Sequence, residues 1–171
     1  RKTLSSNILI APATNDLPLA DLADHLKRVL AETQDSNGSC LLLTSDDVDR
    51  SLGVPNIAQS TPGARHELRL RVWLTEQEKN HSVVLLVADP EVTEWTSRCI
   101  RRADEVMYVA AAGTKPETGR VAQEVQDQEE AHQAGRRKSL VLLYPKDADR
   151  PRGTAAWLDE FGLRNSTGSP Q

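Results

Sequence analysis

Short runs of apolar residues alternate with amphipathic segments along the chain, and five of these runs predict buried β-strands. They lie at residues 7–13, 39–44, 81–90, 105–111 and 139–145. Each run is rich in Leu, Val, Ile or Ala, and turn-forming residues follow the first, second and third of them. Continuous apolar runs of this length are typical of strands that are covered on both faces of a parallel sheet.

The amphipathic segments between these runs predict helices. In residues 17–33, apolar residues recur at helical spacing, while Pro18 is tolerated in a first turn. The segment 45–53 begins with Ser45, which can cap a helix N-terminus, and ends with Gly53, which favours termination. Further helices are expected at residues 68–80, 91–103 and 153–161, and in the second of these Trp95, Cys99 and Ile100 are expected to face inward.

One further helix is predicted within residues 114–135, and its pattern differs from the others. It carries only Val121 and Val125 on an otherwise charged surface, which predicts a solvent-exposed and loosely packed helix.

Strands that alternate with helices predict right-handed β-α-β crossovers and a sheet covered by helices on its faces. We therefore expect an α/β fold, a Rossmann-like three-layer sandwich around a mostly parallel five-stranded sheet. Residues 1–163 are expected to form one such domain. The polar residues 164–171 (RNSTGSPQ) are expected to form a disordered tail or linker.

The composition narrows the classes of partner. The net charge is -4 and the basic residues are interleaved with acidic ones, so nucleic acid is not an expected partner. No apolar run approaches the roughly 20 residues that cross a bilayer. The sequence opens with Arg-Lys-Thr and no initiator Met, so we expect a piece of a longer chain without a signal peptide. Cys40 and Cys99 lie in apolar stretches, and we expect both to be buried, reduced thiols.

A search for catalytic motifs finds none. The loop after the first strand, within APATNDLPLAD, lacks the glycines and the lysine with which phosphate-binding loops hold a nucleotide. The Gly-x-Ser-x-Gly turn of serine esterases is absent from the sequence. The histidines (His25, His66, His81 and His132) are far from one another and from cysteine in sequence. We therefore expect no catalytic residue, no cofactor and no metal site.

The acidic residues at strand ends have two readings. Asp46, Asp47 and Asp49 could bind Mg²⁺, but carboxylates are also favoured in the first turn of a helix, and that structural role is expected. Asp89 stands where switch aspartates of nucleotide-hydrolysing folds stand, yet no phosphate loop accompanies it. We expect its carboxylate to cap a helix that begins near Glu91 or Val92.

Residues 95–110 (WTSRCIRRADEVMYVA), preceded by VVLLVADPEVTE, resemble the neuropathy target esterase family. The matching region lies between the cyclic-nucleotide-binding modules and the patatin-like catalytic domain. The resemblance runs from about Ile8 to Leu158, where a Trp-Leu pair follows the last strand. The motif residues that it singles out, in a structural or interdomain role, are Trp95, Thr96, Cys99, Ile100, Arg101, Ala103 and Asp104.

This sequence departs from the family pattern in two places. After Trp157 the family continues through a His-rich stretch into a glycine-rich oxyanion loop and a catalytic Ser-Asp pair, whereas this sequence ends in NSTGSPQ. The stretch TPGARHE, residues 61–67, is also atypical.

The resemblance implies a parent lysophospholipase that hydrolyses acyl esters of lysophosphatidylcholine or phosphatidylcholine on the cytosolic face of the endoplasmic reticulum membrane. In that reading this segment is a non-catalytic accessory domain, with the patatin-like domain and the cyclic-nucleotide-binding modules as partners. The alternative is a degenerate P-loop-like module that binds a nucleotide or phosphate ligand near Asn15 and Asp16. A free-standing scaffold or pseudo-enzyme is a third hypothesis.

Overall fold

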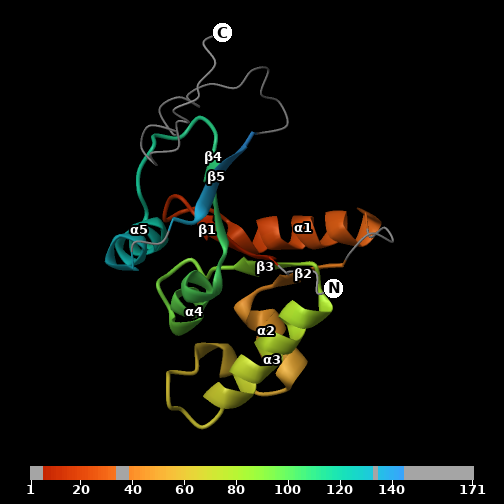
Figure 1. Ribbon diagram of the computed structural model, residues 1–171. Helices are drawn as coiled ribbons and strands as arrows, with labels where there is room; N and C mark the ends of the chain where they lie inside the picture. Colours follow the sequence, from red (N-terminus) through yellow and green to blue (C-terminus); the bar gives the residue numbers. More distant parts are fainter. Residues whose placement is uncertain (1–5, 34–38, 133–134, 145–171) are drawn as a thin grey trace.

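The computed structural model describes residues 6–33, 39–132 and 135–144. Its five strands form one sheet in the order β2-β3-β1-β4-β5, and every pairing between them is parallel (Figure 1). The strands are β1 (Ser6–Pro12), β2 (Cys40–Leu43), β3 (Val83–Val87), β4 (Glu105–Ala111) and β5 (Arg137–Leu143). This sheet confirms the five predicted strands and the α/β class.

Helices fill the connections between the strands. They are α1 (Leu19–Thr33), α2 (Ser45–Leu52), the 3-10 helix η1 (Ile57–Gln59), α3 (Glu67–Asn80), α4 (Glu94–Arg102) and α5 (Arg120–His132). In the described part of the chain, no helix combines the length and the apolar character needed to cross a membrane. The helix expected at residues 153–161, the Trp157-Leu158 pair and the tail at 164–171 lie outside the described residues, and the domain bounds stay a prediction.

Side chains from the two faces of the sheet enter two separate cores. Leu9, Val84 and Leu86 point to the face that carries α2, α3, α4 and α5. Ile10 and Leu42 point to the opposite face, which α1 covers (Figure 1). The alternation of side chains along each strand therefore gives the three layers of a Rossmann-like sandwich.

The short helix α2 has defined caps at both ends. Thr44 remains extended and its hydroxyl accepts a hydrogen bond from the Asp47 amide, while the Asp47 carboxylate accepts one from the Thr44 amide. Gly53 ends the helix with a φ of 68°, as expected. The prediction that Ser45 is the cap is wrong, because Ser45 is already helical and its hydroxyl bonds to Asp89.

Helix α5 is packed tightly, so the prediction of a loose, exposed helix is wrong. Val121, Ala122 and Val125 are at most 1% exposed and join the larger core. One turn further, Glu129 is also buried, and its carboxylate lies 2.5 Å from the Lys138 ammonium group of β5. The narrow apolar stripe is sufficient to pack α5 against the sheet, because Lys138 of β5 compensates the charge of the buried Glu129 carboxylate.

A buried ion pair joins α3 to α4. The Arg98 guanidinium lies 3.1 Å from the Glu67 carboxylate and donates a second hydrogen bond, of 3.0 Å, to the Ser60 carbonyl. Both residues are almost fully buried, and Arg71 contacts the other Glu67 oxygen from the surface. A buried charge needs a charged or strongly polar partner, so this pair fixes how the two helices pack.

The two cysteines are free thiols in different surroundings. Cys99 is fully buried in the larger core, where burial and the nearby Asp89 carboxylate raise the pKa of its thiol well above the usual value. Cys40 is only partly buried, and this burial also raises the pKa of its thiol. The expectation of free thiols is confirmed, but the expectation that Cys40 is buried is wrong because it lies on an edge strand.

Replacing Arg98 by Met should lower the free energy of unfolding by about 3 kcal/mol, because Glu67 would lose its buried partner. The double variant Arg98→Met/Glu67→Leu should recover to within about 1 kcal/mol of the original chain, since it buries no unpaired charge. Urea unfolding measures both values. Equal losses in the single and double variants would contradict the pairing.

The thiols should differ in their reaction with a disulfide reagent at pH 8. Cys40 is accessible and should react in the folded chain, whereas Cys99 should react only after denaturation because it is buried and holds its proton. A Cys40→Ala control should remove the reaction of the folded chain. Rapid titration of both thiols without denaturant would refute the buried position of Cys99.

Candidate functional site

Ligands of open parallel sheets bind beyond the carboxyl ends of the strands, so the loops at that edge form the candidate site. The loop after β1 is held by the chain itself. The Ala13 amide donates to the Val109 carbonyl at 2.8 Å, and the Ala13 carbonyl accepts from the Gly119 amide at 2.7 Å. The Asn15 side-chain oxygen accepts a hydrogen bond of 2.8 Å from the amide of Arg120, the first residue of α5.

Gly119 permits this close contact between the β1 loop and the start of α5. A β-carbon on Gly119 would lie 2.8 Å from the Thr14 carbonyl carbon and 3.0 Å from the Asn15 amide nitrogen. Only a residue without a side chain fits at such distances. The space next to the N-terminus of α5 is therefore occupied by backbone of this chain.

The carboxylate of Asp89, at the end of β3, is the centre of a hydrogen-bond network. It accepts from the Ser45 hydroxyl at 2.7 Å, from the Gln59 amide group at 2.9 Å and from the Thr93 hydroxyl at 2.5 Å. A carboxylate has about four acceptor positions, so three are used here. Asp89 thereby ties together α2, η1 and the start of α4, and it offers little capacity to an external ligand.

Asp89 does not cap α4 directly, and the expectation that it does is wrong. The N-cap is Thr93, whose hydroxyl accepts from the Thr96 amide, and the helix begins at Glu94 rather than near Glu91 or Val92. Asp89 supports the cap indirectly, because its carboxylate accepts a hydrogen bond from the Thr93 hydroxyl. The loop between β3 and α4 is longer than expected, so Asp89 lies too far from the first turn of α4 and the closer Thr93 caps the helix.

A surface ion pair bridges the same edge. Arg120 donates two hydrogen bonds to Glu91, of 2.9 and 2.7 Å. These hydrogen bonds lower the pKa of the Glu91 carboxyl and raise the pKa of the Arg120 guanidinium. Both side chains are exposed, so the pair connects the β3-α4 loop to α5 without adding much stability.

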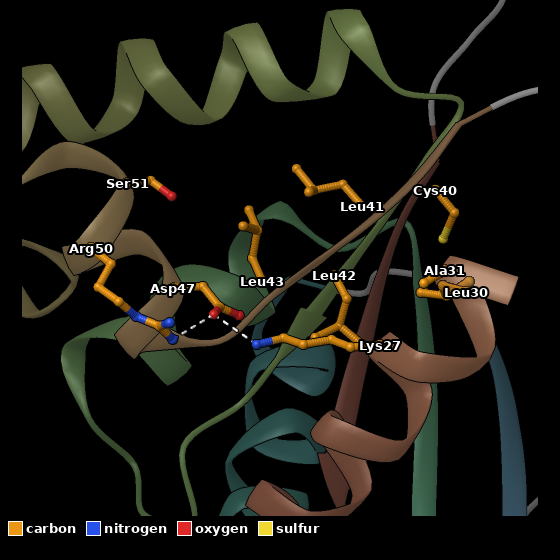
Figure 2. Close-up of a pocket in the computed structure, with 10 residues that line it drawn as sticks. All are labelled: Lys27, Leu30, Ala31, Cys40, Leu41, Leu42, Leu43, Asp47, Arg50 and Ser51. Atoms are coloured by element: carbon orange, nitrogen blue, oxygen red, sulfur yellow. Dashed lines mark hydrogen bonds and ion pairs between the residues drawn. The ribbon is translucent and has the colours of Figure 1, made fainter. Parts of the chain in front are cut away.

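A cavity of about 450 Å³ lies between α1, β2 and α2, and Figure 2 shows the residues that line it. Lys27 of α1 and Arg50 of α2 both bind the Asp47 carboxylate, at 2.7 and 3.0 Å. Burial alone would raise the pKa of Asp47, but hydrogen bonds from Lys27 and Thr44 outweigh it and the pKa is lowered. The rest of the lining is mainly aliphatic.

The three aspartates after β2 have different environments. Asp47 belongs to the helix cap, while Asp49 accepts hydrogen bonds from the amides of Asn56 and Ala58 and Asp46 is exposed. Within the described ranges, no group of three or more His, Cys, Asp or Glu side chains could hold a metal ion.

Four of the seven motif residues lie inside the molecule on α4. Trp95 is fully buried and its indole nitrogen donates to the Val87 carbonyl at 2.9 Å. Thr96 is also buried, and its hydroxyl accepts from the Asp89 amide and donates to the Glu91 carbonyl. Cys99 and Ile100 lie in the larger core.

The remaining motif residues surround the turn into β4. Ala103 is buried and Arg101 is exposed. Asp104 is exposed, but its side chain accepts from the Asn7 amide at 2.9 Å, and its own amide donates to the Asn7 carbonyl at 2.8 Å. This pair of bonds joins the start of β1 to the start of β4, at the sheet edge opposite the candidate site.

Two side chains that hold the fold together, Arg98 and Asn7, were not predicted to do so from the sequence. No role is assigned to Arg98 from the sequence, although its spacing from Trp95 and Arg102 places all three on one face of the helix. Asn7 was taken as a strand residue, yet its amide group donates to Glu78 and to the Arg102 carbonyl. No local sequence pattern indicates these contacts of Asn7, because its partners lie far away in sequence.

Known proteins that resemble this chain agree on one family. The family model described as the neuropathy target esterase family P-loop like domain matches residues 5–163. The chain is 35% identical over 154 residues to patatin-like phospholipase domain-containing protein 7 of Mus musculus, covering 90% of this chain and 10% of that protein. It is 33% identical over 155 residues to neuropathy target esterase sws of Drosophila erecta, with the same coverage. The chain thus spans about a tenth of the length of these relatives.

The fold also occurs in a distant group of solved structures. A plasmid partition protein of Borrelia burgdorferi bound to AMPPNP superposes with a TM-score of 0.54 at 12% identity, covering 94% of this chain and 84% of that one. This likeness concerns the fold. From the family match and the relatives together, the chain belongs to the neuropathy target esterase family, and residues 5–163 correspond to its P-loop-like domain.

Proposed function

We propose that this chain is a non-catalytic accessory domain of a neuropathy-target-esterase-type lysophospholipase. The observation that carries the proposal is the carboxyl edge of the sheet, where Asp89 and the β1 loop are bound by groups of the chain itself. The Gly-x-Ser-x-Gly motif is absent from the sequence, so ester hydrolysis belongs to another part of the parent enzyme. Its substrates are acyl esters of lysophosphatidylcholine or phosphatidylcholine.

The partners in this proposal are the patatin-like catalytic domain and the cyclic-nucleotide-binding modules of the parent chain. The parent works on the cytosolic face of the endoplasmic reticulum membrane, and among the described residues of this segment no helix could span a membrane. The length of the relatives supports the proposal, since nine-tenths of each lies outside the matched region. Within the motif from Trp95 to Asp104, only Arg101 and Asp104 are exposed, so most of the motif packs inside the domain and is not available for contact with a partner.

The outer face of α3 is the best candidate for the contact with the catalytic domain. This helix is apolar on two sides: Leu70 and Leu74 enter the core, whereas Leu68 and Val72 are 62% and 51% exposed. Together with Trp73 the exposed pair lines a cavity of about 680 Å³. Exposed apolar side chains that cluster in this way mark protein contacts.

The alternative function is a nucleotide- or phosphate-binding module. The neighbouring partition protein is bound to AMPPNP, and Asp89 lies at the end of a strand next to β1. Against this alternative, the β1 loop packs onto Gly119, the exposed Asp16 carboxylate near it repels phosphate, and the nearby Arg120 guanidinium is already bound to Glu91. The accessory role is therefore the better supported of the two.

Replacing Leu68 and Val72 by Asp should weaken the contact with the catalytic domain. In a chain that contains both domains, hydrolysis of lysophosphatidylcholine should fall severalfold, because the apolar contact is replaced by two buried charges. The melting temperature of the 171-residue chain should not change, since both side chains are exposed. Val92→Asp, at an exposed valine away from α3, is the matched control and should leave hydrolysis unchanged. Normal hydrolysis in the double variant would show that α3 does not contact the catalytic domain.

Mg²⁺ with AMPPNP, ADP or inorganic phosphate should leave the melting temperature of the 171-residue chain unchanged. A ligand present at a hundred times its dissociation constant would raise the melting temperature by about 5–10 °C for a chain of this size. Differential scanning fluorimetry makes the measurement. A shift of that size with any member of the panel would favour the binding module over the accessory role.

A further inference from the structure

The outer edge of the sheet at β2 has an open row of backbone groups. In the described residues, β2 pairs only with β3. The Ser39 carbonyl accepts from the amides of Ser82 and Val83, so it faces β3. Because successive residues of a strand direct their amide and carbonyl to opposite edges, Leu41 and Leu43 also face β3, and Cys40 and Leu42 face outward. Two residues of β2 thus present unpaired donors and acceptors.

Natural proteins shield such edges with short strands, charges or a covering element. β2 is short, with four residues, but in the part of the chain that the structure describes a hollow lies beside it rather than a covering element. The cavity of about 450 Å³ has the four residues of β2 as its floor and residues of α1 and α2 as its two walls (Figure 2). We call this hollow the β2 groove; the wall residues are Lys27, Leu30 and Ala31 on one side and Asp47, Arg50 and Ser51 on the other.

The charges of the β2 groove favour an acidic partner. Lys27 and Arg50 share one carboxylate, Asp47, which leaves one positive charge in excess. The Arg50 side chain is 74% exposed, so its guanidinium has donors to spare. The aliphatic part of the floor and of the α1 wall suits apolar side chains next to that acid.

The shape of the β2 groove excludes some partners. A second copy would have to bring its own β2 edge into the groove together with the α1 and α2 residues that flank that edge, and these are wider than a single strand. A helix has no free backbone groups to pair with an edge. An extended peptide is narrow enough to enter and supplies the missing backbone partners.

We propose that the β2 groove binds an extended peptide segment that adds as a strand beside Cys40–Leu43 and places an acidic side chain against Arg50. The segment comes from the part of the longer family chain outside these 171 residues. The relatives carry nine-tenths of their length there, and a tethered segment reaches the groove at high effective concentration. The inference that the peptide comes from the parent chain rests on the proposed accessory role, whereas the inference that the β2 groove binds an acidic extended peptide does not.

The test is an array of short overlapping peptides that tiles the remainder of a longer family member, probed with the 171-residue chain. At least one peptide with alternating aliphatic residues and an acid should bind. Cys40→Pro removes an outward amide without touching the bonds to β3, because proline is tolerated at the first residue of an edge strand. It should weaken binding about tenfold, whereas the control Cys40→Ala keeps the amide and should bind normally. Arg50→Gln should weaken binding and Arg50→Lys should restore most of it.

Melting temperatures of the variants verify that each one is folded, and protection of the Cys40 and Leu42 amides from hydrogen exchange reports the added strand directly. Binding of no tiled peptide, or equal binding by Cys40→Pro and Cys40→Ala, would overturn the proposal. A dimer in sedimentation that Cys40→Pro abolishes would also overturn it, in favour of a second copy. The hydrolysis assay of the α3 variants is independent of these outcomes, so failure of the groove and failure of the accessory role can be told apart.

Discussion

The structure depends on how the carboxylate of Asp89 is satisfied at the end of a buried strand. A charged group in that position needs several donors, and the chain supplies them from Ser45, Gln59 and Thr93. Those donors stand on α2, on η1 and at the cap of α4. Asp89 therefore ties all three elements to the end of β3. Trp95 is held in the same place, because its amide donates to Gln59 and its indole nitrogen donates to the Val87 carbonyl.

The same network decides what the domain can do. In an open parallel sheet the carboxyl edge is the natural ligand site, but here its groups are hydrogen-bonded to one another. Asn15 and Gly119 seal the β1 loop onto α5, and Glu91 with Arg120 bridges the loop after β3. A cavity of about 300 Å³ remains at this edge, lined by Thr44, Ser45 and Asp89 among others, but the Asp89 carboxylate in its wall is already hydrogen-bonded to Ser45, Gln59 and Thr93. In the described residues, the apolar outer face of α3 and the β2 groove are two further surfaces that are open to a partner.

Most of the fold could be predicted because its strands and helices follow from local patterns of apolar and polar residues. Each strand is a continuous apolar run, and the glycine that ends α2 acts through its own backbone. The two helix caps were misplaced by one and by four residues, whereas the other errors mainly concern groups whose partners are distant in sequence. Glu129 looks like a solvated residue until β5 brings Lys138 to it, and Arg98 looks like a surface charge until α3 brings Glu67. Asp89 was predicted as a cap, since nothing local shows that Ser45 and Gln59 also reach it.

For the candidate site, sequence could show what is missing but not what replaces it. The absence of a glycine-rich loop was plain, whereas the packing of Thr14 and Asn15 against Gly119 joins segments about a hundred residues apart. The family resemblance identified the segment, and the residues that it highlighted proved to lie mainly in the interior of α4.

Backbone amide chemical shifts of the 171-residue chain test the central claim most directly. They would be recorded with Mg²⁺-AMPPNP and, separately, with a purified patatin-like domain from the same family. The account predicts shift changes along α3 with the patatin-like domain and none at residues 13–17 or Gly119 with the nucleotide. Changes at the β1 loop and Gly119 with the nucleotide, and none on α3 with the protein, would contradict it.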